Sequence, residues 1–303
     1  MFRKLVAVLL IVSFVPASLV AQEAKERSLE GRILPLAKAY KGKVAVAVKN
    51  LQTGESYFLD ADDEMPTASL IKFMIMLEAY MQVSEGKVKL DDRITLRKAD
   101  MVPGSGILTY HFSDGATFPF QDAIHLMMVY SDNTATNLVL DHIGLASTNK
   151  RLAEWGFTHT KLNAKVFRGS TTSLDKERTK KFGLASTTAR ETVQLLEKVH
   201  QGKIVSPEVC KDMLDHMKKC EDKLKLNRYL PEKIVVANKS GTVSDARTDC
   251  GILYLPAGPI AICVLTTQTT DKNYRDDNPG NVVIGRIAEQ VYEHYAVAGK
   301  KAN

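Results

Sequence analysis

Residues 69–72 place a serine three positions before a lysine, at the start of a strongly apolar segment. The pattern predicts a helix that begins near Ser69, where unpaired backbone N–H groups favour developing negative charge. Lys72 would lie about one turn later on the same face, so that its amine can reach the Ser69 hydroxyl. Apolar neighbours would lower the pKa of this amine and let it accept the hydroxyl proton. The pattern therefore suggests an activated serine nucleophile.

Ser-x-x-Lys on its own is a weak signal. The same spacing occurs three more times in the chain, at Ser84/Lys87, Ser147/Lys150 and Ser173/Lys176. Taken alone, the four residues are more often the start of a core helix whose lysine extends to water. Partners elsewhere in the chain have to distinguish these alternatives.

Two further polar triplets lie where predicted elements end. Ser131-Asp132-Asn133 separates two apolar helices, with Asp132 suited to cap the second one. Its serine and asparagine could pass a proton and hold a substrate carbonyl, although an isolated triplet of this kind is more often only a cap. Lys239-Ser240-Gly241 follows a predicted strand, where a lysine and a hydroxyl could bind a carboxylate. The alternative there is an ordinary strand end and turn.

In this order, the three motifs resemble the set found in class A β-lactamases and penicillin-binding proteins. Ser131 follows Ser69 by 62 residues and Lys239 follows Ser131 by 108, which is similar to class A spacing. The stretches 131–138, 143–144 and 185–189 also resemble that family, with 185–189 expected to start a helix. The resemblance covers roughly residues 30–297. It implies opening of a β-lactam ring through an acyl-enzyme intermediate, without a metal or organic cofactor.

The resemblance assigns catalytic roles by position. It implies that Ser69 is the acylated nucleophile and Lys72 its base or part of the base relay. Ser131 would carry a proton to the departing β-lactam nitrogen. The backbone N–H groups of Ser69 and Thr242 would form the oxyanion hole, an arrangement worth several kcal/mol in the transition state.

The resemblance also assigns substrate contacts. Asn133 would hold the substrate's side-chain amide, and Lys239 and Ser240 would bind its carboxylate. Arg247 follows on the next strand segment and would assist, unless it is a surface arginine in the loop 244–247. The implied substrate is a small-molecule β-lactam or a peptidoglycan stem peptide.

One expected residue is missing. Class A enzymes carry a glutamate that positions the hydrolytic water on a loop after the helical lobe, but no carboxylate occurs between Lys161 and Leu174. Glu177, farther along, is a candidate only if the loop folds inward, and Lys72 is another candidate base. We therefore expect an unusual β-lactamase. The alternatives are a penicillin-binding D-alanyl-D-alanine carboxypeptidase or a sensor domain that binds without turnover.

These residues need a scaffold, and hydrophobic periodicity predicts a mixed α and β fold (α+β). Strands are expected at 43–48, 55–59, 234–238, 251–255 and 260–266. Helices are expected at 28–40, 70–83, 120–130, 134–143, 147–155, 187–200, 207–217 and 281–295. The pattern predicts one domain, 22–300, with an antiparallel sheet from both chain ends (about 30–65 and 222–297). A helical lobe (about 66–221) would be inserted between them, with a site at the junction.

Composition is that of a globular protein, with 45% hydrophobic and 25% charged residues. Bases are interspersed with acids, as at 176–178 and 218–221, which indicates solvated surface and argues against a nucleic-acid partner. The seven histidines are scattered and none lies in His-Glu-x-x-His, so no metal site is expected. Cys210 and Cys220 are the closest pair in sequence, but on one continuous helix they would be about 15 Å apart and could not form a disulfide.

The first residues have the features of an export signal. Arg3 and Lys4 precede an apolar run, 5–15, and a small-residue cleavage region ends at Ala21. Removal of residues 1–21 would lower the formal charge from +6 to +4, because two bases and no acids are lost. An uncleaved anchor is the alternative, although the run is short for a membrane span. We expect a monomer that is exported to the periplasm or secreted.

Overall fold

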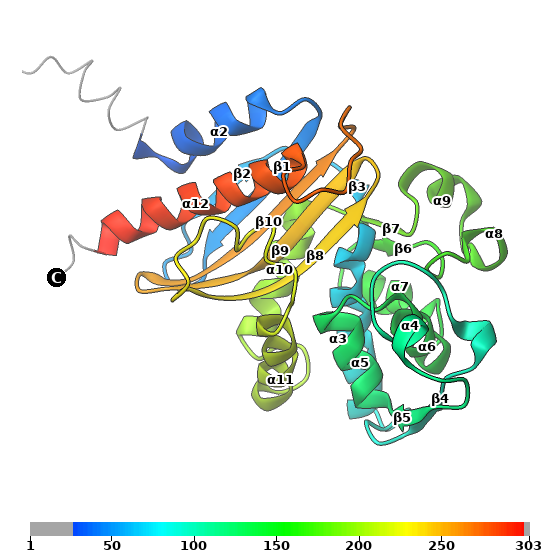
Figure 1. Ribbon diagram of the computed structural model, residues 1–303. Coiled ribbons are helices and arrows are strands. Elements are labelled where there is room, and N and C mark those ends of the chain that lie inside the picture. Colours follow the sequence, from blue (N-terminus) through cyan, green and yellow to red (C-terminus); the bar gives the residue numbers. More distant parts are fainter. Residues whose placement is uncertain (1–26, 300–303) are drawn as a thin grey trace, which may run out of the picture.

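The computed structural model describes residues 27–299, so the predicted signal, residues 1–21, lies outside the described range. Both ends of the described chain build one antiparallel sheet in the order β2-β1-β10-β9-β8 (Figure 1). Its strands are β1 (Lys43–Asn50), β2 (Ser56–Leu59), β8 (Val235–Val243), β9 (Ala246–Leu255) and β10 (Gly258–Thr267). This sheet with its helices confirms the predicted fold class.

Helices cover both faces of the sheet because its central strands are apolar on both sides (Figure 1). On one face, α2 (Leu29–Ala39) packs against α12 (Pro279–Gly299), and Ile33, Ile284 and Ile287 are fully buried there. On the other face, α10 (Ala189–His200) packs against β1 and β10. The sheet is thus a rigid platform whose edge strand β8 is left to face the helical part of the chain.

The middle of the chain is mostly helical and packs around one buried helix, α3 (Lys72–Ser84). Ten of the thirteen residues of α3 are buried, which fits its apolar sequence on all sides. The other helices are η1 (Ala68–Ile71), η2 (Lys98–Asp100), α4 (Leu108–His111), α5 (Phe120–Val129), α6 (Asn133–Ile143), α7 (Ser147–Glu154), α8 (Gly169–Thr172), α9 (Lys176–Phe182) and α11 (Pro207–Lys218). Two small sheets complete this part, β3 (Met65–Pro66) with β7 (Ala185–Thr187) and β6 (Lys161–Leu162), and β4 (Arg93–Thr95) with β5 (Thr117–Pro119).

Two local predictions are corrected and one alternative is removed. The helix predicted from residue 187 begins at Ala189, at the end of the stretch 185–189: residues 185–187 form β7, which pairs with β3 and β6, and Thr188 caps α10 by accepting from the backbone N–H of Glu191. The triplet 239–241 lies within β8, not at a strand end, because pairing with β9 continues to Val243. Arg247 lies on the next strand, β9, as predicted, and is 1% exposed, which removes the alternative of a surface arginine in the loop 244–247.

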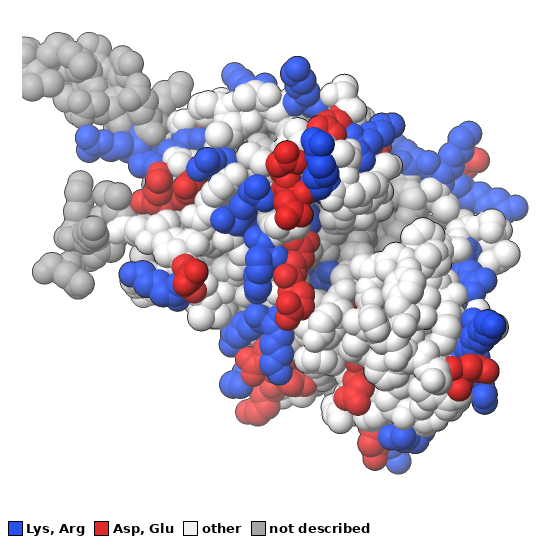
Figure 2. Space-filling model, viewed as in Figure 1, with Lys and Arg blue, Asp and Glu red and all other residues white. Residues whose placement is uncertain are grey.

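The four cysteines form no disulfide, and the charged side chains on the surface shown in Figure 2 are of both signs. All four cysteines are buried and free, and Cys220 lies beyond the end of α11. Lys and Arg alternate with Asp and Glu on the face shown in Figure 2, without a stripe of bases on that face. No helix among residues 27–299 is long and apolar enough to cross a bilayer.

Candidate active site

Ser69 is partly exposed on the wall of a cleft of about 670 Å³. It lies in η1, directly after Ala68, whose φ of 47° places an alanine in the left-handed region. Such a backbone costs roughly 1–3 kcal/mol and is stable only when the surroundings fix it. Strand β9 does so, since the Thr248 hydroxyl donates to the carbonyl of Thr67 at 2.8 Å. Ser69 is therefore held in place by the sheet as well as by its own helix, η1.

Lys72 is fully buried and donates to the 131–133 loop at three points. Its amine lies 2.6 Å from the Ser131 carbonyl, 3.2 Å from the Ser131 hydroxyl and 2.8 Å from Asn133 Oδ1. Burial lowers the pKa of Lys72 well below its ordinary value, and the neighbouring Lys239 lowers it further. Within residues 27–299, no hydrogen bond joins this amine to the Ser69 hydroxyl. The Lys72 amine is therefore suited to accept a proton, and in this conformation it is hydrogen-bonded to Ser131 and not to Ser69.

The 131–133 loop is held rigidly between α5 and α6. Asp132 caps α6, as predicted, by accepting from the backbone N–H of Ala135 at 2.8 Å, and it also accepts from Ile107 and Leu108. Ser131 has a φ of 53°, a second strained residue at the site. Asp132 thus fixes the backbone next to Ser131 by accepting from three backbone N–H groups.

Strand β8 brings the third motif to the same place. The Lys239 amine donates to the Ser131 hydroxyl at 3.0 Å and to the Ser240 carbonyl at 2.8 Å. Burial lowers the pKa of Lys239 as well. Gly241 passes close to the backbone of Ser69: a Cβ at Gly241 would lie 2.8 Å from the Ser69 nitrogen. Only glycine allows this close approach, which joins η1 to the strand.

Two predicted substrate contacts differ in their surroundings. Thr242 is exposed and lines the cleft, next to Ser240 and Gly241. Arg247 is not among the described residues that line the cleft. Its guanidinium donates to the carbonyls of Val243, Ala246 and Asn273, and burial lowers its pKa. In this arrangement Arg247 ties two loops together, and a direct contact with a substrate carboxylate would require it to exchange these partners.

The serine hydroxyls of Ser69 and Ser131 and the buried amines of Lys72 and Lys239 lie around one cleft, and this arrangement agrees with what sequence comparison finds. The sequence model of the beta-lactamase enzyme family matches residues 28–295. The chain belongs to this family.

Relatives of the chain are distant but similar over most of its length. The beta-lactamase VEB-1 of Pseudomonas aeruginosa is 21% identical over 97% of this chain and 98% of its own. The crystal structure of a beta-lactamase from Sphaerobacter thermophilus has a TM-score of 0.78 and 27% identity, covering 88% of this chain and 97% of that one. The structure of PBP-A has a TM-score of 0.77 and 26% identity, covering 89% and 96%. The protein is a serine hydrolase of the β-lactamase type.

This β-lactamase-family cleft has an apolar wall where the sequence lacks the expected acid. Residues 164–167 line the cleft, and Val166 is held by Asn137, which donates to its carbonyl and accepts from its N–H. Among the described residues, the carboxylates that line the cleft are Glu221 and Asp222, which come from a different segment. Glu177 is exposed on α9 and lines a separate hollow with Glu64 and Phe182. The loop does not fold inward to bring Glu177 to the cleft.

Several cleft residues were not found from the sequence. Asp222 accepts a hydrogen bond from Ser240 and an ion pair from the buried Lys225. Three aromatic side chains that line the cleft are exposed, those of Tyr130, Phe167 and Tyr274. Asp222 and Lys225 are three residues apart, a spacing that could have suggested a pair. Nothing in the sequence indicated that this pair faces the cleft.

Proposed function

We propose that the protein attacks the amide of a β-lactam with Ser69 and forms an acyl-enzyme that is released slowly. The observation that carries this proposal is the connected set of Lys72, Ser131 and Lys239 beside a nucleophile that lines a cleft. A buried amine with a lowered pKa can take the proton that the attack releases. The group of residues therefore has the parts needed for acylation.

The proton path follows from these contacts. As the Ser69 oxygen bonds to the β-lactam carbonyl, its proton passes to Lys72, and the backbone N–H groups of Ser69 and Thr242 receive the developing oxyanion. Ser131 donates its hydroxyl proton to the departing ring nitrogen, since it lies within 3.2 Å of both amines. Lys72 then returns a proton to Ser131. The relay between Lys72, Ser131 and Lys239 uses hydrogen bonds that the fold already holds.

Deacylation requires a base for the incoming water, and the wall formed by Val166 offers none. General-base assistance is worth about 10²–10⁴-fold in rate, so the acyl-enzyme should persist unless Lys72 replaces the missing acid. This supports the second candidate, a penicillin-binding protein whose natural substrates are peptidoglycan stem peptides ending in D-alanyl-D-alanine. Structural similarity also extends to a mutant of PBP-A whose structure is an acyl-enzyme complex with penicillin G (26% identity, TM-score 0.76, covering 89% of this chain and 96% of that one).

The assigned substrate contacts complete the proposal. Asn133 would hold the substrate's side-chain amide, and Lys239 and Ser240 the carboxylate end, with Arg247 assisting after rearrangement. Export of a monomer, directed by the leader at residues 1–21, would place the cleft where β-lactams and peptidoglycan occur. Neither chemistry needs a cofactor.

Mass spectrometry of the protein mixed with benzylpenicillin tests these alternatives. A Ser69 adduct that decays over many minutes supports slow release, and no adduct is expected on the Ser69→Ala variant. Immediate return to the unmodified mass with accumulating penicilloate would instead identify an efficient β-lactamase. If the protein never gains the mass of the drug and makes no penicilloate, the proposed acylation is wrong.

A further inference from the structure

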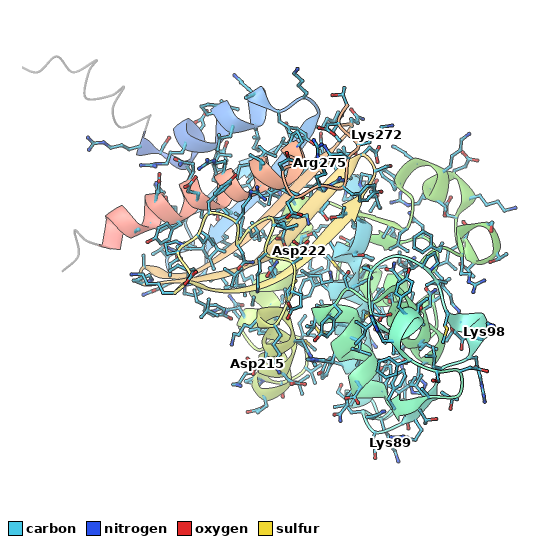
Figure 3. All side chains as sticks on the ribbon, viewed as in Figure 1. Lys89, Lys98, Asp215, Asp222, Lys272 and Arg275 are labelled. Atoms are coloured by element: carbon cyan, nitrogen blue, oxygen red, sulfur yellow. The ribbon has the colours of Figure 1, made fainter. Side chains whose placement is uncertain are left out.

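Two of the buried cysteines face each other across the middle of the sheet. Cys250 on β9 is the direct partner of Cys263 on β10 in the antiparallel register. Both are fully buried in the same hydrophobic cluster, whereas Ile262 and Val264, on either side of Cys263, belong to the cluster on the other face. Side chains fill the space around these central strands (Figure 3). The two thiols therefore share one closed space inside the protein.

The spacing of these two cysteines fits a disulfide. Directly opposed residues in an antiparallel pair have Cα atoms about 4.5–5.5 Å apart, and the Cα atoms of a disulfide lie about 4.4–6.8 Å apart. Opposed Cβ atoms are about 4.5–5.5 Å apart, against about 3.5–4.5 Å in a disulfide, so a shift of about 1 Å is enough. In the structure both thiols are free. Cys250 and Cys263 are thus a reduced pair in a position to be oxidised.

The other two cysteines lie outside the sheet. Cys210 is in α11 and Cys220 follows just beyond the end of that helix. Ten residues separate them, which is about 15 Å along a helix axis and too long for a bridge. Cys220 lines the cleft, and its charged neighbours include Lys239 and Asp222. The sheet register therefore selects Cys250 and Cys263 as the pair that can be joined.

Burial makes both thiols unreactive once the sheet has formed. Disulfide exchange requires a thiolate, because the neutral thiol is not the nucleophile. Burial raises the pKa of the Cys250 thiol well above its ordinary value, and burial also raises the pKa of Cys263. An external disulfide cannot reach these residues, since neither has any exposed surface. Exchange must therefore take place while the chain folds, before the sheet closes.

We propose that Cys250 and Cys263 are a redox site, which an external disulfide oxidises to a cross-strand disulfide as the chain folds. One cysteine thiolate attacks the external disulfide, and a mixed disulfide forms as one thiolate leaves. The second cysteine thiolate attacks the cysteine sulfur of the mixed disulfide and releases the other thiolate. The pair loses two electrons and two protons, and the external disulfide is reduced to two thiols.

The oxidising surroundings follow from export, so the inference rests on that part of the proposed function and not on acylation of Ser69. The bridge would also lie next to one of the amines of the cleft. Lys239 on β8 is the register partner of Cys250, and Ala47 on β1 is the register partner of Cys263. A covalent bond between β9 and β10 would therefore hold the strand against which β8 carries Lys239.

Counting free thiols tests the inference without any β-lactam and without export. The full chain is denatured, reduced, refolded with oxidised and reduced glutathione, and then alkylated with iodoacetamide in urea. We expect alkylation of two of the four cysteines, Cys210 and Cys220, and a peptide in which Cys250 is linked to Cys263. Four alkylated cysteines would overturn the inference, as would a link that involves Cys210 or Cys220.

Reduction of the refolded protein tests whether the bridge lies inside the sheet. Dithiothreitol should leave it intact in the folded protein, because both cysteines are fully buried, and should reduce it within minutes in urea. Equal rates of reduction in buffer and in urea would contradict a bridge in the sheet.

Two variants complete the test. Cys263→Ala should give three alkylated cysteines after the same refolding, and a bridge that persists in this variant would overturn the inference. Cys210→Ala is the matched control, because it also removes one buried thiol, and it should keep the bridge and give one alkylated cysteine. If Cys263→Ala does not fold, the linked peptide of the unaltered chain still decides. Failure of the proposed acylation is recognised separately, since it changes none of these thiol counts.

Discussion

Replacing Asp249 with asparagine should stabilise the protein more at alkaline than at acidic pH. Asp249 lies on β9, paired with Ser240 of the neighbouring strand β8, and is fully buried. Its oxygens accept from the side-chain amide of Asn238 at 3.1 and 3.2 Å and from the backbone N–H of Leu226 at 3.1 Å. Burial, and then the charge of Asp222, raise the pKa of Asp249 from 3.8 to about 7. The folded protein therefore holds a proton that the unfolded chain releases.

The size of the effect follows from this shift. A rise of about 3 pKa units corresponds to about 4 kcal/mol, at about 1.4 kcal/mol per unit. The stability is fully present below the unfolded pKa and is lost as the pH rises through the folded pKa. Near pH 8 the whole amount, about 4 kcal/mol, has been lost, whereas near pH 5 the loss is only about 1.5 kcal/mol. Asparagine cannot ionise and avoids this loss.

Urea denaturation of both proteins at about pH 5 and about pH 8 measures the difference. The variant must also turn the Asn238 amide, whose oxygen now accepts from Asn227, and this cost is the same at both pH values. The stability difference between variant and wild type should therefore grow by about 2.5 kcal/mol from the lower to the higher pH. Asp276→Asn, at an exposed position, should show no such growth. Parallel stability curves for Asp249→Asn and wild type would refute the reasoning.

Three further outcomes test other parts of the molecule. Lys72→Arg places a permanently charged group at this position and removes the proton acceptor, so acylation by benzylpenicillin should slow by about 10²–10⁴-fold. The acylation rate should also no longer rise with pH through the lowered pKa of Lys72. A rate within threefold of wild type would contradict the role of Lys72 as the base. Val166→Glu should speed the loss of the Ser69 adduct, followed by mass spectrometry, by up to about 10²–10⁴-fold, and Val166→Gln should not. His125 and His216, 3.2 Å apart, both have pKa values lowered chiefly by burial, so stability should fall as the pH drops below about 6.5; the double variant with glutamine should lose this dependence in thermal melts.

The parts of the site that depend on local sequence were predictable. Ser69, Lys72 and the 131–133 loop lie at helix boundaries, and caps and apolar periodicity mark such boundaries in the sequence. The capping role of Asp132 was inferred from its type and position alone and is confirmed by its hydrogen bond to Ala135. Helix and strand positions follow the same pattern because burial of apolar faces decides them.

Contacts between segments that are far apart in the sequence explain the features of the site that could not be predicted. β8 continues through Lys239, Ser240 and Gly241 because β9 supplies partners to the end of the strand, and polar residues in a buried strand give no periodic signal. The left-handed backbone conformations of Ala68 and Ser131 could not be predicted from the sequence either, since neither residue type favours them. Tertiary contacts impose both, which is where strain at a functional site is expected.

The absence of an acid between Lys161 and Leu174 was plain from the sequence, but its consequence depends on the fold. A missing glutamate matters only if the loop that lacks it faces the nucleophile's cleft. Val166 lines that cleft and is held there by Asn137, while Glu177 lines a separate hollow. The structure thus identifies Val166 as the apolar position beside the cleft at which a substituted glutamate could act as the base for deacylation.

Asp222 and the buried Asp249 are coupled electrostatically. Asp222 holds its negative charge because Lys225 and Ser240 satisfy it, and this charge is one reason that the buried Asp249 keeps its proton. Neutralising Asp222 would therefore lower the pKa of Asp249 and restore part of the charge that was removed. Effects of substitutions at the two acids on stability should therefore not be additive, since the charge of Asp222 influences the protonation of Asp249.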